Sequence, residues 1–292
     1  MIKKTIIIGI SLFLIYTFFV TFLAPYWWKA SQHQWQDNII KAQKYIYDEN
    51  GLHSNVIVGS SLSCRLIMDS IPQTYNLSFG GQSLFDGLNI LTHSEKLPEN
   101  VFIEINFVIR PEDKSFTSSL NSVLFYPKKY LLSMRDNKQP IGVIGKLISY
   151  RIIGRIISHT KAFLNLADEN EHNDDDIFPK MLQLQKDNYS IIPSESFLKE
   201  SFENLKEYIV KLEKKNIKVI FFEMPVNYQL NNLPRANLIR KTFYEYFPKS
   251  SYKYISIPEF EKFVTSDGVH LSGDEAKIYT MYLKRNMENY FR

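Results

Sequence analysis

The stretch NVIVGSSLSCRL, residues 55–66, decides how the chain is interpreted. Its first residues, Asn55–Val58, form the apolar run of a buried strand, and a Gly-Ser-Ser turn leads directly from them into an amphipathic segment. A serine at a strand-to-helix turn can be a nucleophile, or the turn can be an ordinary glycine-serine connection. The stretch alone does not distinguish the two.

Two later runs resemble this strand, Asn100–Val108 (NVFIEINFV) and Ile217–Glu223 (IKVIFFE). Neither alternates in polarity, which favours strands covered on both faces, as in parallel sheets. A long helix is predicted before the third run, with Ser194 as its N-cap. Its expected buried face carries Phe197, Ser201, Leu205, Tyr208 and Leu212. The pattern predicts an α/β fold, a parallel sheet sandwiched by helices.

The strand-helix rhythm fails between Lys114 and Pro193, so residues 115–193 are predicted to be an insertion over one edge of the sheet within a single domain, residues 55–292. A short helix is expected at 147–166. The acidic run DENEHNDDD, residues 168–176, is interpreted as a solvated surface loop. A calcium site there is the alternative, but the spacing does not match an EF-hand loop.

The N-terminus predicts a membrane anchor over residues 1–30. About twenty uncharged residues, 5–24, follow Lys3 and Lys4, which is enough to cross a bilayer. The two lysines favour a cytoplasmic N-terminus, and residues 26–28 (YWW) suit an aromatic belt, so the remaining chain is expected outside the cell membrane. A cleaved signal peptide is the alternative; the apolar run is long for one, and Pro25 occupies the expected cleavage region.

Residues 31–54 are predicted to form an amphipathic connecting helix, with Trp35, Ile39, Ala42 and Ile46 at helical spacing. The net charge of +4 is small and spread along the chain, which argues against nucleic acid as a partner. The single cysteine excludes an intrachain disulfide and a cysteine metal cluster.

The stretch TSDGVHLSGDEAKIYTMYL, residues 265–283, places Asp267 three residues before His270, ahead of a predicted helix. Ser272 and Glu275 have the spacing of a capping box, which would fix the preceding loop. In such a loop Asp267 could orient the imidazole of His270. By itself this spacing is a weak signal, since a histidine before a helix is more often structural.

Together, strand-Gly-Ser-Ser near the start and Asp-Gly-Val-His near the end resemble the SGNH/GDSL hydrolase superfamily. YNLSFGGQSLFDGL, residues 75–88, is similar to the family's second block, and VFIEINFV to its third. The family's Gly-Asp-Ser is Gly-Ser-Ser here, so Ser61 takes the place of the nucleophile and Ser60 that of the aspartate. In the third block, Glu104 and Phe107 replace a glycine and an aspartate.

The resemblance implies a flavodoxin-like sheet and a Ser61–His270–Asp267 triad. It also implies an oxyanion hole formed by the backbone N–H groups of Ser61 and Gly81 and the side-chain amide of Asn106. No metal or other cofactor is expected.

The N-terminal helix and the Gly-Ser-Ser form are more similar to the membrane-anchored branch that includes subunits of D-alanyl-lipoteichoic acid, alginate and peptidoglycan O-acyltransferase systems. This implies a transferase that takes an acyl group, most simply acetyl, from a membrane-bound O-acyltransferase partner and passes it to a cell-surface glycan or polymer. A carbohydrate esterase and a catalytically inactive glycan-binding or scaffold module are the alternatives.

Three charged residues are candidates for the surroundings of the site. Glu104 lies mid-strand among apolar residues, so it needs a buried cation or a place at the strand's open end. Arg65 could neutralise it or grip an anionic substrate, and an ion pair is the simpler expectation. Glu223 ends a strand on the nucleophile's side of the sheet, where it either lines the pocket or packs.

Overall fold

The computed structural model describes residues 2–23, 33–47, 53–95, 97–140, 142, 143, 145, 177–256 and 263–291. The chain divides into two compact units, one of residues 1–47 and 118–172, the other of residues 48–117 and 173–292. Each unit is described by itself. The predicted helix at 147–166, the acidic run and its alternative calcium site, and the aromatic residues 26–28 lie outside the described residues.

The larger unit contains a five-stranded parallel sheet in the order β2-β1-β3-β4-β5, which confirms the predicted parallel α/β arrangement. The strands are β1 (Asn55–Val58), β2 (Thr74–Asn76), β3 (Asn100–Glu104), β4 (Lys218–Phe222) and β5 (Lys253–Tyr254). Three of them are the predicted apolar runs: β1 has the predicted bounds, and β3 and β4 are shorter than the runs Asn100–Val108 and Ile217–Glu223. The register pairs Val58 with Ile103, so Glu104 comes one position beyond the end of β1.

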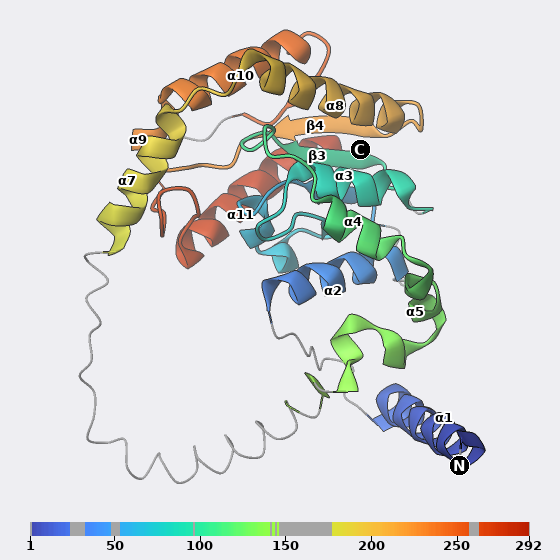
Figure 1. Cartoon of the computed structure of the whole chain (residues 1–292). Helices are drawn as coiled ribbons and strands as arrows, with labels where there is room; N and C mark the ends of the chain where they lie inside the picture. Colours follow the sequence, from blue (N-terminus) through green and yellow to red (C-terminus); the bar gives the residue numbers. More distant parts are fainter. Residues whose placement is uncertain are drawn as a thin grey trace, which may run out of the picture. The chain divides into compact units, whose positions relative to one another are not determined.

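Helices cover both faces of this sheet. The helices of the larger unit are α3 (Leu84–His93), α7 (Ile177–Ser190), α8 (Glu195–Glu213), α9 (Tyr228–Asn231), α10 (Pro234–Tyr246) and α11 (Gly273–Met287), and α4 (Lys114–Leu120) begins in this unit and ends in the smaller one. On one face Phe221 contacts Phe243 of α10, with ring centroids 4.8 Å apart, and α8 packs on β4 (Figure 1). On the other face Ile57, Phe102 and Ile220 share a buried cluster with Tyr279 and Leu283 of α11. Burial of alternate residues on opposite faces explains why the strands are apolar throughout.

The predicted N-cap of α8 is confirmed, because the Ser194 side chain accepts a hydrogen bond from the Phe197 backbone N–H. The buried face of α8 includes Ser201, Leu205, Tyr208 and Leu212 as expected, whereas Phe197 is exposed. The predicted capping box of α11 is wrong: Ser272 precedes the helix, but its side chain makes no capping hydrogen bond. A capping box does begin α3, where Ser83 and Asp86 bond each other's backbone N–H groups.

The smaller unit contains α1 (Ile2–Phe18), a π-helical turn (Phe19–Leu23), α2 (Gln34–Tyr47), α5 (Pro127–Tyr130), and 3₁₀ turns at Val123–Phe125, Leu132–Met134 and Asp136–Lys138. The helix over Ile2–Phe22 is long and apolar enough to cross a membrane, by length and composition. The amphipathic helix α2 buries Ile39 and Ala42 as predicted, while Trp35 is exposed. Its Gln43 side chain bonds both the carboxylate and the backbone N–H of Asp136.

The approach of β3 to the end of β1 predicts a sharp contrast between two glycines. A Cβ on Gly59 would lie 2.2 Å from Ser63 Oγ and 2.6 Å from Glu104 Cβ, whereas a Cβ on Gly273 would meet nothing within 4 Å. We expect Gly59→Ala to lower the free energy of unfolding by about 1–3 kcal/mol through overpacking. We expect Gly273→Ala, in the first turn of α11, to leave it unchanged or raise it by up to about 1 kcal/mol. Chemical denaturation of the detergent-solubilised chain measures both, and equal effects would contradict this packing.

Candidate active site

The Gly-Ser-Ser stretch turns sharply at the carboxyl end of β1, the edge at which parallel α/β sheets bind ligands. The backbone N–H of Cys64 donates to Ser60 O at 3.1 Å, and Leu66 N–H donates to Ser63 O at 3.2 Å. The amphipathic segment expected after the serines is therefore only a 3₁₀ turn, Ser63–Arg65, followed by a second one at Met68–Ser70. Ser61 lies at the start of this turn and is partly exposed.

The loop that carries Asp267 and His270 is closed by backbone hydrogen bonds. Thr265 and Leu271 form an antiparallel bridge, and Ser266 N–H donates to His270 O at 2.8 Å. Gly268 adopts φ +96°, a conformation that favours glycine. These bonds take the place of the predicted capping box in fixing the loop.

Ser61, His270 and Asp267 form a continuous hydrogen-bonded chain. His270 Nε2 is 2.9 Å from Ser61 Oγ, and His270 Nδ1 is 2.6 Å from Asp267 Oδ2. The other carboxylate oxygen, Asp267 Oδ1, accepts the backbone N–H groups of Val269 at 3.0 Å and His270 at 2.8 Å. Both carboxylate oxygens of Asp267 thus accept hydrogen bonds. The imidazole of His270 is held between the Asp267 carboxylate at Nδ1 and the Ser61 hydroxyl at Nε2.

The surroundings of Asp267 favour its ionised form. Burial acts to raise its pKa, but hydrogen bonds from the His270 side chain and backbone and from Val269 N–H outweigh burial and lower the pKa to about 2. Asp267 is therefore ionised at neutral pH and can hold the Nδ1–H tautomer of His270, which leaves Nε2 able to accept a proton from Ser61.

Glu104 lies directly beneath the serine turn and is 1% exposed. Its Oε2 accepts hydrogen bonds from the backbone N–H groups of Ser60 (2.9 Å) and Ser63 (3.1 Å) and from the Ser63 hydroxyl (2.6 Å), and its Oε1 accepts from the Ser60 hydroxyl (2.8 Å). Burial raises the pKa of Glu104, and these four hydrogen bonds oppose the rise. The carboxylate is therefore satisfied entirely by donors of the turn.

The expected Arg65–Glu104 ion pair is wrong. Within the described part of the chain no cation contacts Glu104, because the serine turn supplies all of its partners. Arg65 instead donates from Nη1 to Ser266 Oγ at 3.3 Å and to Leu271 O at 3.4 Å. The exposed arginine thereby links the serine turn to the loop of Asp267 and His270.

The site contains a second layer of polar side chains that sequence analysis missed. Ser63 Oγ lies 2.8 Å from Ser78 Oγ, and Asn76 Nδ2 donates to Ser63 O at 2.7 Å. The only sequence signal for this layer is the repeated serine spacing in GSSLS, since the register that brings β2 alongside β1 is not visible in the sequence.

The two other expected oxyanion donors differ in their surroundings. Gly81 is exposed in a turn after β2 with φ +74°. The Asn106 amide is paired with the segment that follows β4: Nδ2 donates to Met224 O at 2.8 Å, and Oδ1 accepts from Met224 N–H at 2.8 Å. One hydrogen of Nδ2 is therefore engaged, which leaves the other as the one that Asn106 could offer to an oxyanion.

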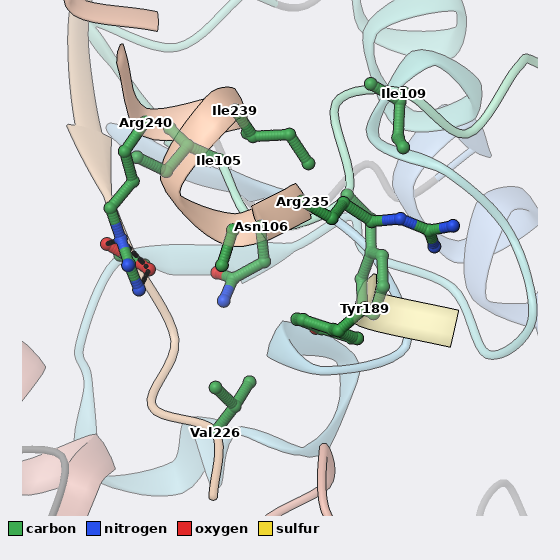
Figure 2. A pocket seen from close by; sticks show the side chains of 11 residues that line it. Ile105, Asn106, Ile109, Tyr189, Val226, Arg235, Ile239 and Arg240 are labelled. Atoms are coloured by element: carbon green, nitrogen blue, oxygen red, sulfur yellow. Dashed lines mark hydrogen bonds and ion pairs between the residues drawn. The ribbon is translucent and has the colours of Figure 1, made fainter. Parts of the chain in front are cut away.

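Glu223 lines a small cavity together with Asn106, Tyr189 and Arg235 (Figure 2). It is paired with Arg240, whose Nη2 lies 2.6 Å from Glu223 Oε1. Burial raises the pKa of Tyr189, which keeps its hydroxyl protonated. The residues that line this cavity do not include Ser61, Asp267 or His270.

No cluster of three or more histidine, cysteine or acidic side chains suited to a metal ion occurs among the described residues. No protein-family model and no curated protein matches this chain.

The donors around Glu104 predict that the carboxylate cannot be replaced by an amide. In Glu104→Gln an NH₂ group would face donors in place of one acceptor oxygen, and we expect the free energy of unfolding to fall by about 1–3 kcal/mol. Because the turn carries Ser61, we also expect Ser61 to react more slowly with an acyl ester in the folded fraction of this variant. Asp86→Asn is the matched control: Asp86 is equally buried and accepts from Ser83 and Asp113 N–H, away from the turn. Equal loss of reactivity per folded molecule in both would contradict a role specific to Glu104.

The low pKa of Asp267 predicts a pH-dependent contribution to stability. When folding lowers the pKa of a carboxyl group, that group stabilises the folded chain at pH values above its ordinary pKa, here 3.8. The stabilisation is lost as the pH falls towards the pKa in the folded chain, here about 2. We therefore expect the stability difference between wild type and Asp267→Asn to be largest above about pH 5 and to shrink on acidification. Urea titrations over this range measure it, with exposed Asp69→Asn as a control for net charge. A difference that does not change with pH would contradict the assignment.

Proposed function

We propose that this chain is an SGNH-type serine enzyme that forms an acyl ester on Ser61. The observation that carries the proposal is the hydrogen-bonded chain from Ser61 Oγ through His270 to Asp267 at 2.9 and 2.6 Å. A serine hydroxyl is a poor nucleophile unless a base removes its proton, and this arrangement provides a base and a group that orients it. The site lies at the carboxyl edge of a parallel sheet, where ligands bind in such folds.

The reaction proceeds in two halves. Ser61 Oγ attacks the acyl carbonyl while His270 Nε2 takes the hydroxyl proton, and His270 returns this proton to the leaving group as the carbonyl–leaving-group bond breaks. An acceptor hydroxyl then gives its proton to Nε2 and attacks the Ser61 ester, and the returned proton restores the serine hydroxyl. Asp267 stays ionised throughout and stabilises the imidazolium.

In both halves the carbonyl oxygen carries negative charge. The proposed donors to it are the backbone N–H groups of Ser61 and Gly81 and the free Nδ2 hydrogen of Asn106. Each such donor contributes on the order of 3 kcal/mol to the transition state.

The transferase version is favoured by the apolar helix over Ile2–Phe22. In this version the N-terminus is cytoplasmic, and the α/β unit lies outside the cell membrane. A membrane-bound O-acyltransferase supplies the acyl group, most simply acetyl, and a cell-surface glycan or polymer accepts it. With water as the acceptor the same triad is an esterase. A binding or scaffold module would not need a hydrogen bond between Ser61 and His270.

Incubation of the detergent-solubilised chain with a short-chain aryl ester tests the acyl-serine step. Intact mass spectrometry should find one acyl adduct on the wild type and none on Ser61→Ala. Formation of the adduct should slow by about 10²–10⁴-fold in His270→Ala, which lacks the base.

Ser60→Ala is the matched control for the neighbouring hydroxyl, because Ser60 Oγ donates to Glu104. It should still form the adduct, at a reduced rate. An adduct that survives Ser61→Ala, or a folded wild type that forms none, would contradict the proposal. A long-lived adduct discharged by glycan hydroxyls supports the transferase, and rapid hydrolysis supports the esterase.

A further inference from the structure

The smaller unit carries an exposed apolar face at residues 123–130. The side chains of Val123, Tyr126 and Tyr130 are 89%, 67% and 65% exposed. The backbone is helical through the 3₁₀ turn Val123–Phe125 and α5, so this spacing puts the three side chains on one side, and the rings of Tyr126 and Tyr130 lie 5.7 Å apart. We call this surface the tyrosine face.

The opposite side of this helical segment is held in place. Phe125 is buried against Tyr47 with ring centroids 5.0 Å apart, and the Tyr47 hydroxyl donates to Phe125 O at 2.8 Å. Lys128 pairs with Asp136 at 2.6 Å. The tyrosine face therefore lies on a packed segment. Its three large side chains are exposed, whereas Phe125 on the other side of the same segment is buried.

The segment that follows the tyrosine face contacts the apolar helix α1. Ser133 Oγ lies 2.8 Å from Thr17 Oγ1, and the Tyr16 hydroxyl donates to Lys138 O. Tyr130 is three residues before Ser133, so its Cα is within about 11 Å of the Ser133 Cα. Thr17 in turn lies about 9 Å before the end of the helical run at Leu23. The tyrosine face is thus close to the carboxyl-terminal end of the apolar helix.

We propose that the tyrosine face rests on the surface of a lipid bilayer and forms a second membrane contact beside α1. Tyrosine side chains suit the headgroup region, since the ring is apolar and the hydroxyl remains hydrated. Exposed Lys129, whose Nζ lies 6.0 Å from the Tyr130 ring, supplies a cation for lipid phosphates. Continuity with α1 favours lipid over a second copy of the chain. The inference rests on the membrane anchor of the proposed function and not on its acyl chemistry.

The test places a single environment-sensitive fluorophore on the full chain in vesicles of phosphatidylcholine and phosphatidylglycerol that contain nitroxide-labelled lipid. Cys64 is replaced by serine, and Val123→Cys carries the probe. We expect the lipid nitroxide to quench this probe at least about twofold more than one on Lys44→Cys, an exposed position of α2, because the face lies at headgroup depth. Lys129→Glu should reduce quenching at position 123 in anionic vesicles.

A third probe site separates the inference from the anchor on which it depends. Leu14→Cys lies on the exposed surface of α1 and should be quenched strongly if that helix is in the bilayer. Quenching at 14 without quenching at 123 would overturn the inference alone, whereas no quenching at either position would overturn the anchor as well. The emission of the probe at position 123 could instead shift as in an apolar environment without quenching by the lipid nitroxide. That result would mean that protein covers the tyrosine face, which also overturns the inference.

Discussion

The carboxylate of Glu104 is the constraint on which the serine turn depends. A buried carboxylate without a cation costs several kcal/mol unless donors surround it, and here every donor comes from the turn that follows β1. This requirement explains the composition of GSSLS: Ser60 and Ser63 satisfy Glu104, glycine is needed at 59 because Glu104 leaves no room for a Cβ, and only Ser61 faces His270.

The two carboxylates near Ser61 act in different ways. Asp267 accepts a hydrogen bond from the His270 imidazole and so acts on the Ser61 hydroxyl through His270. Glu104 accepts hydrogen bonds from the backbone N–H groups of Ser60 and Ser63 and so fixes the backbone that carries Ser61. The residue before Ser61 is itself a serine, Ser60, and the carboxylate at this turn comes from the neighbouring strand, because the β1–β3 register sets Glu104 beside Gly59.

The sequence predicted the features that depend on local pattern. The apolar runs located three of the five strands, and the Asp-x-x-His spacing identified two side chains that the structure joins to Ser61. Strands β2 and β5 are too short to carry a periodic signal. The expected Arg65–Glu104 pair was wrong because the β1–β3 register places the donors of the serine turn around Glu104, and residue spacing does not encode that register. The Ser272 capping box was wrong because the Ser272 side chain makes no capping hydrogen bond, and the loop before α11 is closed instead by the Thr265–Leu271 bridge.

The loop of Asp267 and His270 is held from several directions. Arg65 donates to Leu271 O, the backbone N–H of Asn227 donates to Gly268 O at 2.8 Å, and Leu182 of α7 lies so close behind Gly268 that a Cβ there would approach it to 3.1 Å. Helix α7 falls within the predicted insertion, so part of that segment supports the site. A loop restrained in this way holds the imidazole in place beside Ser61. In the proposed acyl transfer, this preorganisation would spare the reaction the cost of ordering the imidazole.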